Sequence, residues 1–187
     1  MTNQLTRRIF LTGGSAALVF GGSATGANAQ NALLQGHIDN SVSTFREVFR
    51  QSGISSNLTN FLEHALSDRT TPRYDRFLAS GVLSTLQAIE DGSFNRLNQD
   101  EQITLMRCAL KDTGRTLTYL YSSYRGAQSV NNNQETRNAI RNTQSAYRKI
   151  RRADNALDPL FRNATESCTS IYSRTIGNRP YRPSLSI

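Results

Sequence analysis

Apolar residues recur at steps of three and four along most of this chain, which is the spacing of one face of an α-helix. The first such segment covers residues 32–51, and a shorter one follows it and stops near Asp68. A third begins at Thr71-Pro72, where a capping hydroxyl precedes a proline at the first helical position, and ends at Asp91-Gly92. Its apolar stripe is four turns long and consists of Tyr74, Phe77, Leu78, Val82, Leu86 and Ile89.

The second half of the chain predicts three more helices. Asn98 is expected to cap the fourth, which carries the longest apolar face in the sequence and which Gly114 should kink or break. Gly126 and Asn131-Asn132-Asn133 predict the loop after it. The fifth helix, about residues 134–153, has only a thin apolar stripe. Asp158-Pro159 repeats the cap-plus-proline pattern and predicts the start of a sixth helix, which Gly177 should end.

No segment alternates apolar and polar residues with a period of two, so no strand is expected. Six helices of roughly ten to twenty-five residues, joined by short loops, favour a helical bundle. We therefore predict an all-α protein, a single antiparallel helical bundle of five to six helices.

The N-terminus has the three parts of an export leader. Residues 1–8 are polar and basic, residues 9–26 are mildly apolar, and Ala27-Asn28-Ala29 is a small-x-small cleavage site. Six residues resemble the consensus of the twin-arginine (Tat) export signal, from which the sequence departs at Thr12, where lysine is common. They are Thr6, Arg7, Arg8, Ile9, Phe10 and Leu11.

This resemblance implies a bacterial protein that folds in the cytoplasm, engages the Tat translocase and works in the periplasm or outside the cell. An ordinary secretory signal with two chance arginines is the alternative interpretation. We expect cleavage after Ala29, a helical domain over residues 30–175 and a basic, proline-containing tail over residues 176–187. The apolar run of the leader is too weak for a stable span, so no transmembrane anchor is expected.

The net charge of the chain is +8, and arginine supplies most of its cations. Lys111 and Lys149 are the only lysines among 22 basic residues. Arginine can form forked hydrogen bonds with carboxylates and phosphates, although positive charge alone does not identify a partner.

The predicted fifth helix concentrates this charge on one face. Arg137, Arg141 and Arg148 fall within roughly 60° of one another at 100° per residue, and tyrosines 119, 121 and 124 are near in sequence. An extracytoplasmic location disfavours nucleic acid as the partner and favours an acidic protein or an anionic envelope polymer. A solvated helix face without a partner is the alternative. The expected binding residues are Arg137, Arg141, Arg148, Lys149, Arg151 and Arg152.

Cys108 and Cys168 both fall in predicted helices. In an oxidising compartment an even pair of cysteines indicates one disulfide, and two buried thiols are the alternative. The bond would close a loop of about 60 residues, for which chain entropy gives roughly 4 kcal/mol of stabilisation.

Candidate chemistry is sparse in the rest of the chain. Haem-attachment, phosphate-loop, dinucleotide and serine-hydrolase motifs are all missing from the sequence, so a cofactor stays unknown. Glu63, beside an apolar helix face, is a weak candidate for the acid of a glycan hydrolase. His37 and His64 are weak metal candidates, and Met106 could join them in a haem site.

The sequence thus favours an exported, non-enzymatic envelope protein that binds an anionic partner on a basic helix face. A cell-envelope glycan hydrolase and a metal- or haem-binding helical bundle remain alternatives.

Overall fold

The structure is a computed structural model, and it describes residues 23–161 and 167–175. Every regular element in these residues is helical, which confirms the predicted all-α class. The elements are α1 (Ser23–Arg50), α2 (Ser55–Ser67), α3 (Arg73–Glu90), the 3-10 helix η1 (Ser93–Arg96), α4 (Gln99–Val130), α5 (Gln134–Phe161) and α6 (Cys168–Thr175).

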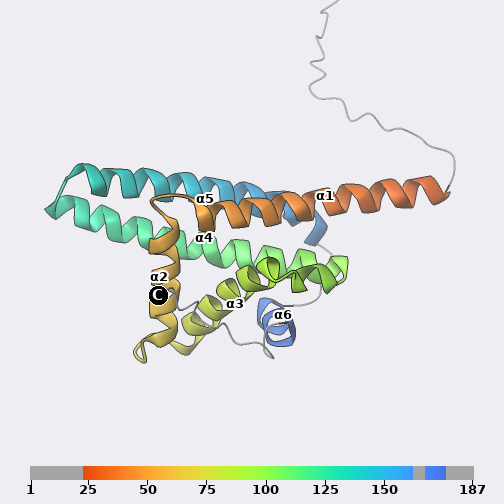
Figure 1. The fold of residues 1–187 in the computed structure, drawn as a ribbon, viewed down its shortest axis with the longest axis horizontal. Coiled ribbons are helices and arrows are strands. Elements are labelled where there is room, and N and C mark those ends of the chain that lie inside the picture. The colour runs from red at the N-terminus through yellow and green to blue at the C-terminus, as the bar shows by residue number, and fades with distance from the viewer. Residues whose placement is uncertain (1–22, 162–166, 176–187) are drawn as a thin grey trace, which may run out of the picture.

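The helices alternate in direction around α4 (Figure 1). Helices α4 and α5 form a long antiparallel hairpin with the most extensive helix–helix contact in the molecule, and α1 packs next along α5. Helix α3 packs on α4 from the other side, antiparallel to it, while α2 crosses the bundle direction. The short helix α6 packs on α4 beside α3, so α4 lies at the centre of the bundle.

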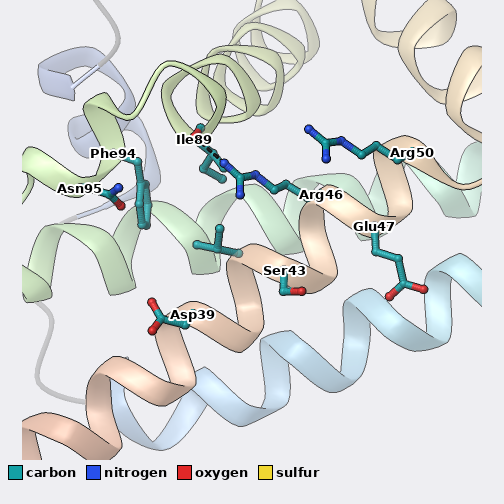
Figure 2. A pocket seen from close by; sticks show the side chains of 9 residues that line it. Asp39, Ser43, Arg46, Glu47, Arg50, Ile89, Phe94 and Asn95 are labelled. Carbon is teal, nitrogen blue, oxygen red and sulfur yellow. Dashed lines mark hydrogen bonds between the residues drawn. The ribbon is translucent and has the colours of Figure 1, made fainter.

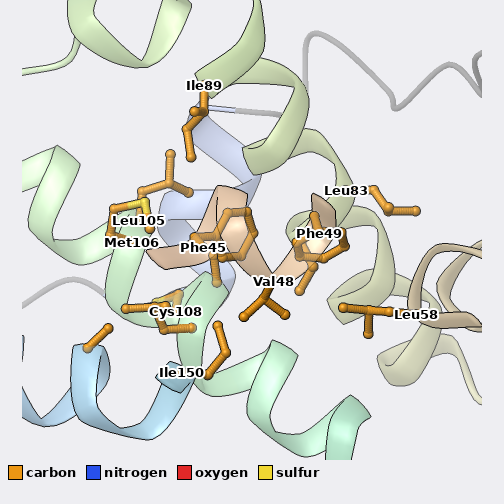
Figure 3. Packing of buried hydrophobic residues seen from close by; sticks show 14 of the residues in the cluster. Phe45, Val48, Phe49, Leu58, Leu83, Ile89, Leu105, Met106, Cys108 and Ile150 are labelled. Atoms are coloured by element: carbon orange, nitrogen blue, oxygen red, sulfur yellow. The ribbon is translucent and has the colours of Figure 1, made fainter. Parts of the chain in front are cut away.

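One contiguous core joins all six α-helices. Phe45, Val48 and Phe49 of α1 lie at its centre, with the rings of Phe45 and Phe49 5.0 Å apart (Figure 3). Their neighbours come from every other helix, because each amphipathic helix buries its apolar stripe against the others. The core includes Leu58, Leu83, Leu105, Met106 and Ile150 around them, and it extends to Ile171 of α6.

The structure confirms the predicted N-cap of α4 and contradicts the predicted N-cap of α3. Asn98 forms a complete capping box, in which its side chain accepts from the Glu101 amide at 2.9 Å and the Glu101 carboxylate accepts from the Asn98 amide at 3.0 Å. Helix α3 instead has Pro72 at its N-cap, and the Thr71 hydroxyl donates to the Asp68 carboxylate at 3.2 Å. The prediction that Thr71 caps this helix is therefore wrong.

The predicted boundary between the fifth and sixth helices is also wrong. Helix α5 continues through Asp158-Pro159 to Phe161, because a proline this close to the end removes few helical hydrogen bonds. Arg107 of α4 holds this last part of α5 through ion pairs with Asp154 and Asp158, and Leu157 is fully buried. Contacts with α4 thus outweigh the local helix-breaking signal.

Two glycines that predicted interruptions lie inside α4. Gly114 is buried against Ile150 and Tyr147 of α5, so packing keeps the helix continuous there, and Gly126 is followed by another turn of helix. Only residues 131–133 connect α4 to α5.

Several sequence predictions fall at the edges of the structure. Helix α1 begins at Ser23, so the expected cleavage position after Ala29 falls within it, and cleavage stays a prediction. Arg7 and Arg8 of the leader and the tail over residues 176–187 lie outside the described residues. Within those residues, none of the helices combines the length and the apolar character needed to cross a bilayer.

Candidate functional site

The basic residues of α5 separate into two groups. Arg141, Arg148, Arg151 and Arg152 are exposed and share one side of the helix, whereas Lys149 lies about 100° around the helix from Arg148. The Lys149 ammonium donates to the carboxylate of Glu47 at 2.7 Å and to the side-chain oxygen of Gln51 at 3.3 Å. Lys149 thereby connects α5 to α1, and the structure does not bring it together with the exposed arginines.

Arg137 is the remaining predicted binding residue. It is half-buried near the start of α5, where its guanidinium donates to the side-chain oxygen of Gln134 at 3.1 Å and to the carbonyl of Asn132 at 2.9 Å. Arg137 therefore secures the α4–α5 turn and contributes its charge to the end of the face.

A groove of about 460 Å³ runs beside the exposed arginines, between α4 and α5. Arg148 and Arg151 border it together with Tyr121 and Tyr147, and the amide of Gln144 donates to the Tyr121 hydroxyl at 3.1 Å. Two aromatic rings beside two guanidinium groups offer an anionic partner both charge and apolar contact.

A second groove of about 330 Å³ shares Tyr147 and Arg151 with the first and adds Lys111 of α4. Its lining acid, Asp154, lies 3.6 Å from the guanidinium of Arg107, and burial raises the pKa of Asp154. The two grooves thus form one basic strip along the α4–α5 seam.

Only one of the three tyrosines expected near this face borders it. Tyr121 lines the groove, Tyr119 lies on the opposite side of α4 in a groove with α2 and α3, and Tyr124 lies near Asn57 of α2. Sequence reasoning did not place Tyr147 on this groove, because its spacing from Ile140 and Ile150 puts it in the apolar stripe of α5. Its position one residue before Arg148 was the available signal.

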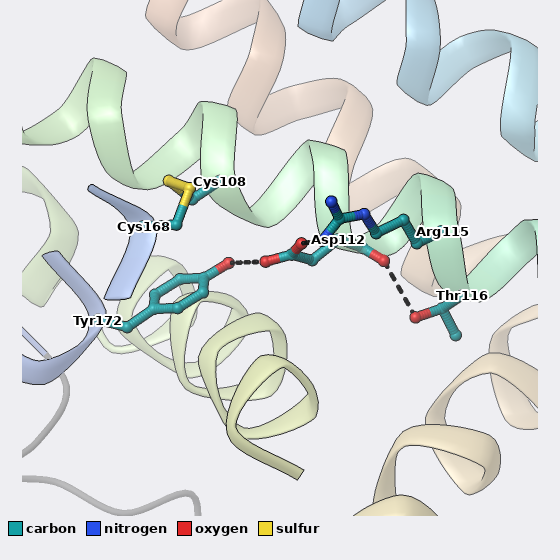
Figure 4. Close-up of polar contacts among 6 residues, drawn as sticks. All are labelled: Cys108, Asp112, Arg115, Thr116, Cys168 and Tyr172. Carbon is teal, nitrogen blue, oxygen red and sulfur yellow. Dashed lines mark hydrogen bonds and ion pairs between the residues drawn. A yellow bond between two sulfur atoms is a disulfide. The ribbon is translucent and has the colours of Figure 1, made fainter. Parts of the chain in front are cut away.

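The predicted disulfide is present, and a hydrogen bond lies beside it (Figure 4). Cys108 and Cys168 are bonded with their Cα atoms 5.5 Å apart, and one helical turn further on the Tyr172 hydroxyl donates to the Asp112 carboxylate at 3.1 Å. The other carboxylate oxygen of Asp112 accepts from Arg115 at 3.2 Å. Helix α6 is therefore attached to α4 by a disulfide and a hydrogen bond one turn apart, and the ion pair between Arg174 and Glu101 adds a third connection.

Asp112 and Tyr172 are the buried members of this cluster. Desolvation raises the pKa of Asp112 and, together with the adjacent carboxylate, raises the pKa of Tyr172 well above its ordinary value. Sequence reasoning did not find the Asp112–Tyr172 pair. The available signal was that each residue follows a cysteine by four positions, which places it on the same helix face as the disulfide.

The two histidines proposed as metal ligands lie on different helices, and Glu63 is next to one of them in sequence. Glu63 is half-buried on α2, His64 is exposed on the same helix, and His37 is half-buried on α1. Met106 is fully buried in the core. Within residues 23–161 and 167–175, no three His, Cys, Asp or Glu side chains are grouped to hold a metal ion.

A further cavity of about 530 Å³ lies between α1, α3 and η1 (Figure 2). Its central cation, Arg46, donates to the carbonyl of Ile89 at 2.7 Å and so satisfies an oxygen in the last turn of α3. The guanidinium of Arg50 lies 3.7 Å from the carboxylate of Glu90, and Asp39 and Glu47 also line the cavity, the latter paired with Lys149. This cavity is organised by contacts between helices.

Comparison of the chain with protein-family models, with curated proteins and with solved structures gave no match.

Proposed function

We propose that this protein is an exported, non-enzymatic binding protein that holds an anionic partner on α5. The binding surface consists of Arg141, Arg148, Arg151 and Arg152 with the adjoining groove that Tyr121 and Tyr147 line. The partner is an acidic protein or an anionic polymer of the cell envelope.

One contrast supports this proposal. Most of the arginines that pair with acids elsewhere in the described residues join two helices, as Arg107 does with Asp154 and Asp158, while Arg115 pairs with Asp112 within α4. The four exposed arginines of α5 form no ion pair within the described parts of the chain. Four like charges on one helix face repel one another, so a partner that neutralises them gains binding free energy.

A charge-reversal experiment tests the proposal. Arg141→Glu with Arg148→Glu should weaken binding to poly-L-glutamate and to polyphosphate roughly tenfold or more, since each lost pair costs about 0.5–1 kcal/mol and each new like-charge pair adds to that. Binding should also weaken steeply with salt. The measurement is a titration of the protein with each polymer in low and in physiological salt, followed by a pull-down from envelope extract.

The matched control changes the same charge elsewhere. Arg69, between α2 and α3, and Arg96, in η1, are exposed on elements that do not belong to the α4–α5 seam. Arg69→Glu with Arg96→Glu should retain binding to within about threefold, because only general charge attraction is reduced. Equal loss in both double variants would show that net charge, and not the α5 face, attracts the partner.

The export route is tested separately. The proposal of Tat-dependent transport rests on the leader residues Thr6 to Leu11, and Arg7→Lys with Arg8→Lys should leave the protein in the cytoplasm. Cell fractionation of the two forms measures this, and undiminished export of the double variant would favour an ordinary secretory signal.

A further inference from the structure

A different groove, of about 730 Å³, lies where α2, α3 and α4 meet. It is larger than either groove on the α4–α5 seam, and its volume falls in the range of sites that hold a small organic molecule. Its principal lining side chains are Phe61, His64, Tyr74, Asp75, Arg115 and Tyr119.

The exposed aromatic side chains of the described residues gather in this groove. Phe61, Tyr74 and Tyr119 are 38%, 58% and 62% exposed, and all three border it from different helices. Of the large apolar side chains that are exposed in the described residues, only Leu33 and Val130 lie elsewhere. Aromatic surface that is concentrated in one concavity, and not scattered, is typical of a binding site.

Arg115 is the cation of this groove, and it is held by an acid. One guanidinium nitrogen donates to the buried carboxylate of Asp112 at 3.2 Å, and the Tyr74 hydroxyl lies close enough to help raise the pKa of Arg115. The side chain nevertheless stays 48% exposed, and its other donors have no partner within residues 23–161 and 167–175. Because Tyr172 holds Asp112 in turn, the guanidinium is oriented before any ligand arrives.

We propose that this groove binds a small aromatic monocarboxylate, with the carboxylate on Arg115 and the ring between Tyr74 and Tyr119. A carboxylate is the planar acceptor that the free edge of a guanidinium fits best. The aromatic body replaces water on the exposed tyrosine rings. Asp75 also lines the groove, so a second negative charge on the ligand would be repelled.

This inference does not rest on the proposed function of α5. The two surfaces share no lining residue, and they take ligands of different size. Binding of a small molecule in the groove between α2, α3 and α4 (the α2–α4 groove) and binding of a large anionic partner on α5 can therefore be tested one at a time.

A matched pair of probes tests the proposal, namely 2-naphthoate and its neutral amide, 2-naphthamide. Titration of the full chain, followed by probe fluorescence, should give saturable binding of naphthoate and roughly tenfold weaker binding of the amide, since a charge-assisted hydrogen bond is lost. Arg115→Gln should weaken naphthoate by a similar factor and leave the amide nearly unchanged.

Two further variants protect the test against misfolding. Tyr119→Ala changes a ring that is 62% exposed, so it should fold normally and weaken both probes about equally. Arg115→Lys keeps a cation beside Asp112 and should bind naphthoate more weakly than the wild type, because lysine lacks the planar fork. Arg141→Glu with Arg148→Glu should bind naphthoate as the wild type does.

Four results would overturn the inference. The first is absence of saturable naphthoate binding, including the case in which the protein sediments as a dimer and a second copy fills the groove. The second is equal affinity for the acid and the amide. The third is unchanged naphthoate binding in both Arg115→Gln and Tyr119→Ala. The fourth is loss of binding only in the α5 double variant, which would place the carboxylate on α5.

Discussion

The contact between Gly81 of α3 and Tyr172 of α6 leaves no room for a side chain at position 81. A Cβ atom added at Gly81 would lie 2.4–2.6 Å from three carbons of the Tyr172 ring, closer than such atoms can pack. The ring cannot easily retreat, because Tyr172 is 2% exposed, is hydrogen-bonded to Asp112 and follows the disulfide of Cys168 by one turn.

Two opposing terms set the magnitude of Gly81→Ala. Alanine stabilises a helix interior by about 1 kcal/mol relative to glycine. Overpacking a filled core costs about 1–3 kcal/mol, and displacing Tyr172 from Asp112 leaves a buried polar group that costs about 1–3 kcal/mol more. We expect Gly81→Ala to lower the free energy of unfolding by about 2 kcal/mol or more, which lowers Tm by roughly 5 °C in a chain of this size.

Gly126→Ala is the matched control. Gly126 also lies inside a helix, but a Cβ there meets nothing within 4 Å, so the substitution should stabilise the protein by about 0.5–1 kcal/mol. Urea unfolding of the oxidised chain, followed by far-UV circular dichroism, measures both variants. If Gly81→Ala lowers the free energy of unfolding and Gly126→Ala raises it, the loss of stability at Gly81 comes from contact with the Tyr172 ring.

A double-mutant cycle gives the result that could refute this reasoning. Tyr172→Ala removes the ring, so Gly81→Ala introduced on that background should no longer destabilise the protein and should add up to about 1 kcal/mol. If Gly81→Ala costs the same with and without the ring, or if it stabilises the wild type, the close approach is not what requires glycine at this position.

The remaining predictions concern the cross-links between helices. Replacing Cys108 and Cys168 by serine should lower the free energy of unfolding by roughly 4 kcal/mol, and a reductant should then have no further effect on urea unfolding. Burial raises the pKa of Asp112 in the folded protein above its ordinary value of 3.8, so the free energy of unfolding should fall as pH rises from 3.8 through the raised pKa. Asp112→Asn should lose this pH dependence in urea unfolding, and a pH profile parallel to that of the wild type would contradict the assignment. A double-mutant cycle on Lys149 and Glu47 should give only about 0.2–1 kcal/mol of coupling, since Glu47 is 60% exposed, and a coupling of several kcal/mol would contradict that estimate.

The fold class could be predicted from the sequence because apolar periodicity is a property of each helix by itself. The helix ends were harder, because they depend on partners far along the chain. Asp158-Pro159 has the local chemistry of a helix start, yet ion pairs with Arg107 and the burial of Leu157 extend α5 past it. Gly114 favours a break locally, and packing against α5 prevents one.

The basic face of α5 could be predicted in part for the same reason. The exposed arginines share one side of a single helix, so spacing alone brings them together, whereas the contact of Lys149 with α1 depends on tertiary packing. The α2–α4 groove was not predicted. Its lining comes from three helices, and neither Tyr74 nor Arg115 carries a local signal that would place them side by side.

The attachment of α6 has a consequence for the order in which the protein folds and opens. Helices α4 and α5 are neighbours in sequence and share the largest contact, so their hairpin can form early, whereas Cys168 and Tyr172 must close a loop of 60 residues onto α4. Substitutions at the α4–α5 seam should then slow refolding, and the loss of the Tyr172 hydrogen bond should mainly accelerate unfolding. The lifetime of the native protein against proteases would accordingly depend on its shortest α-helix.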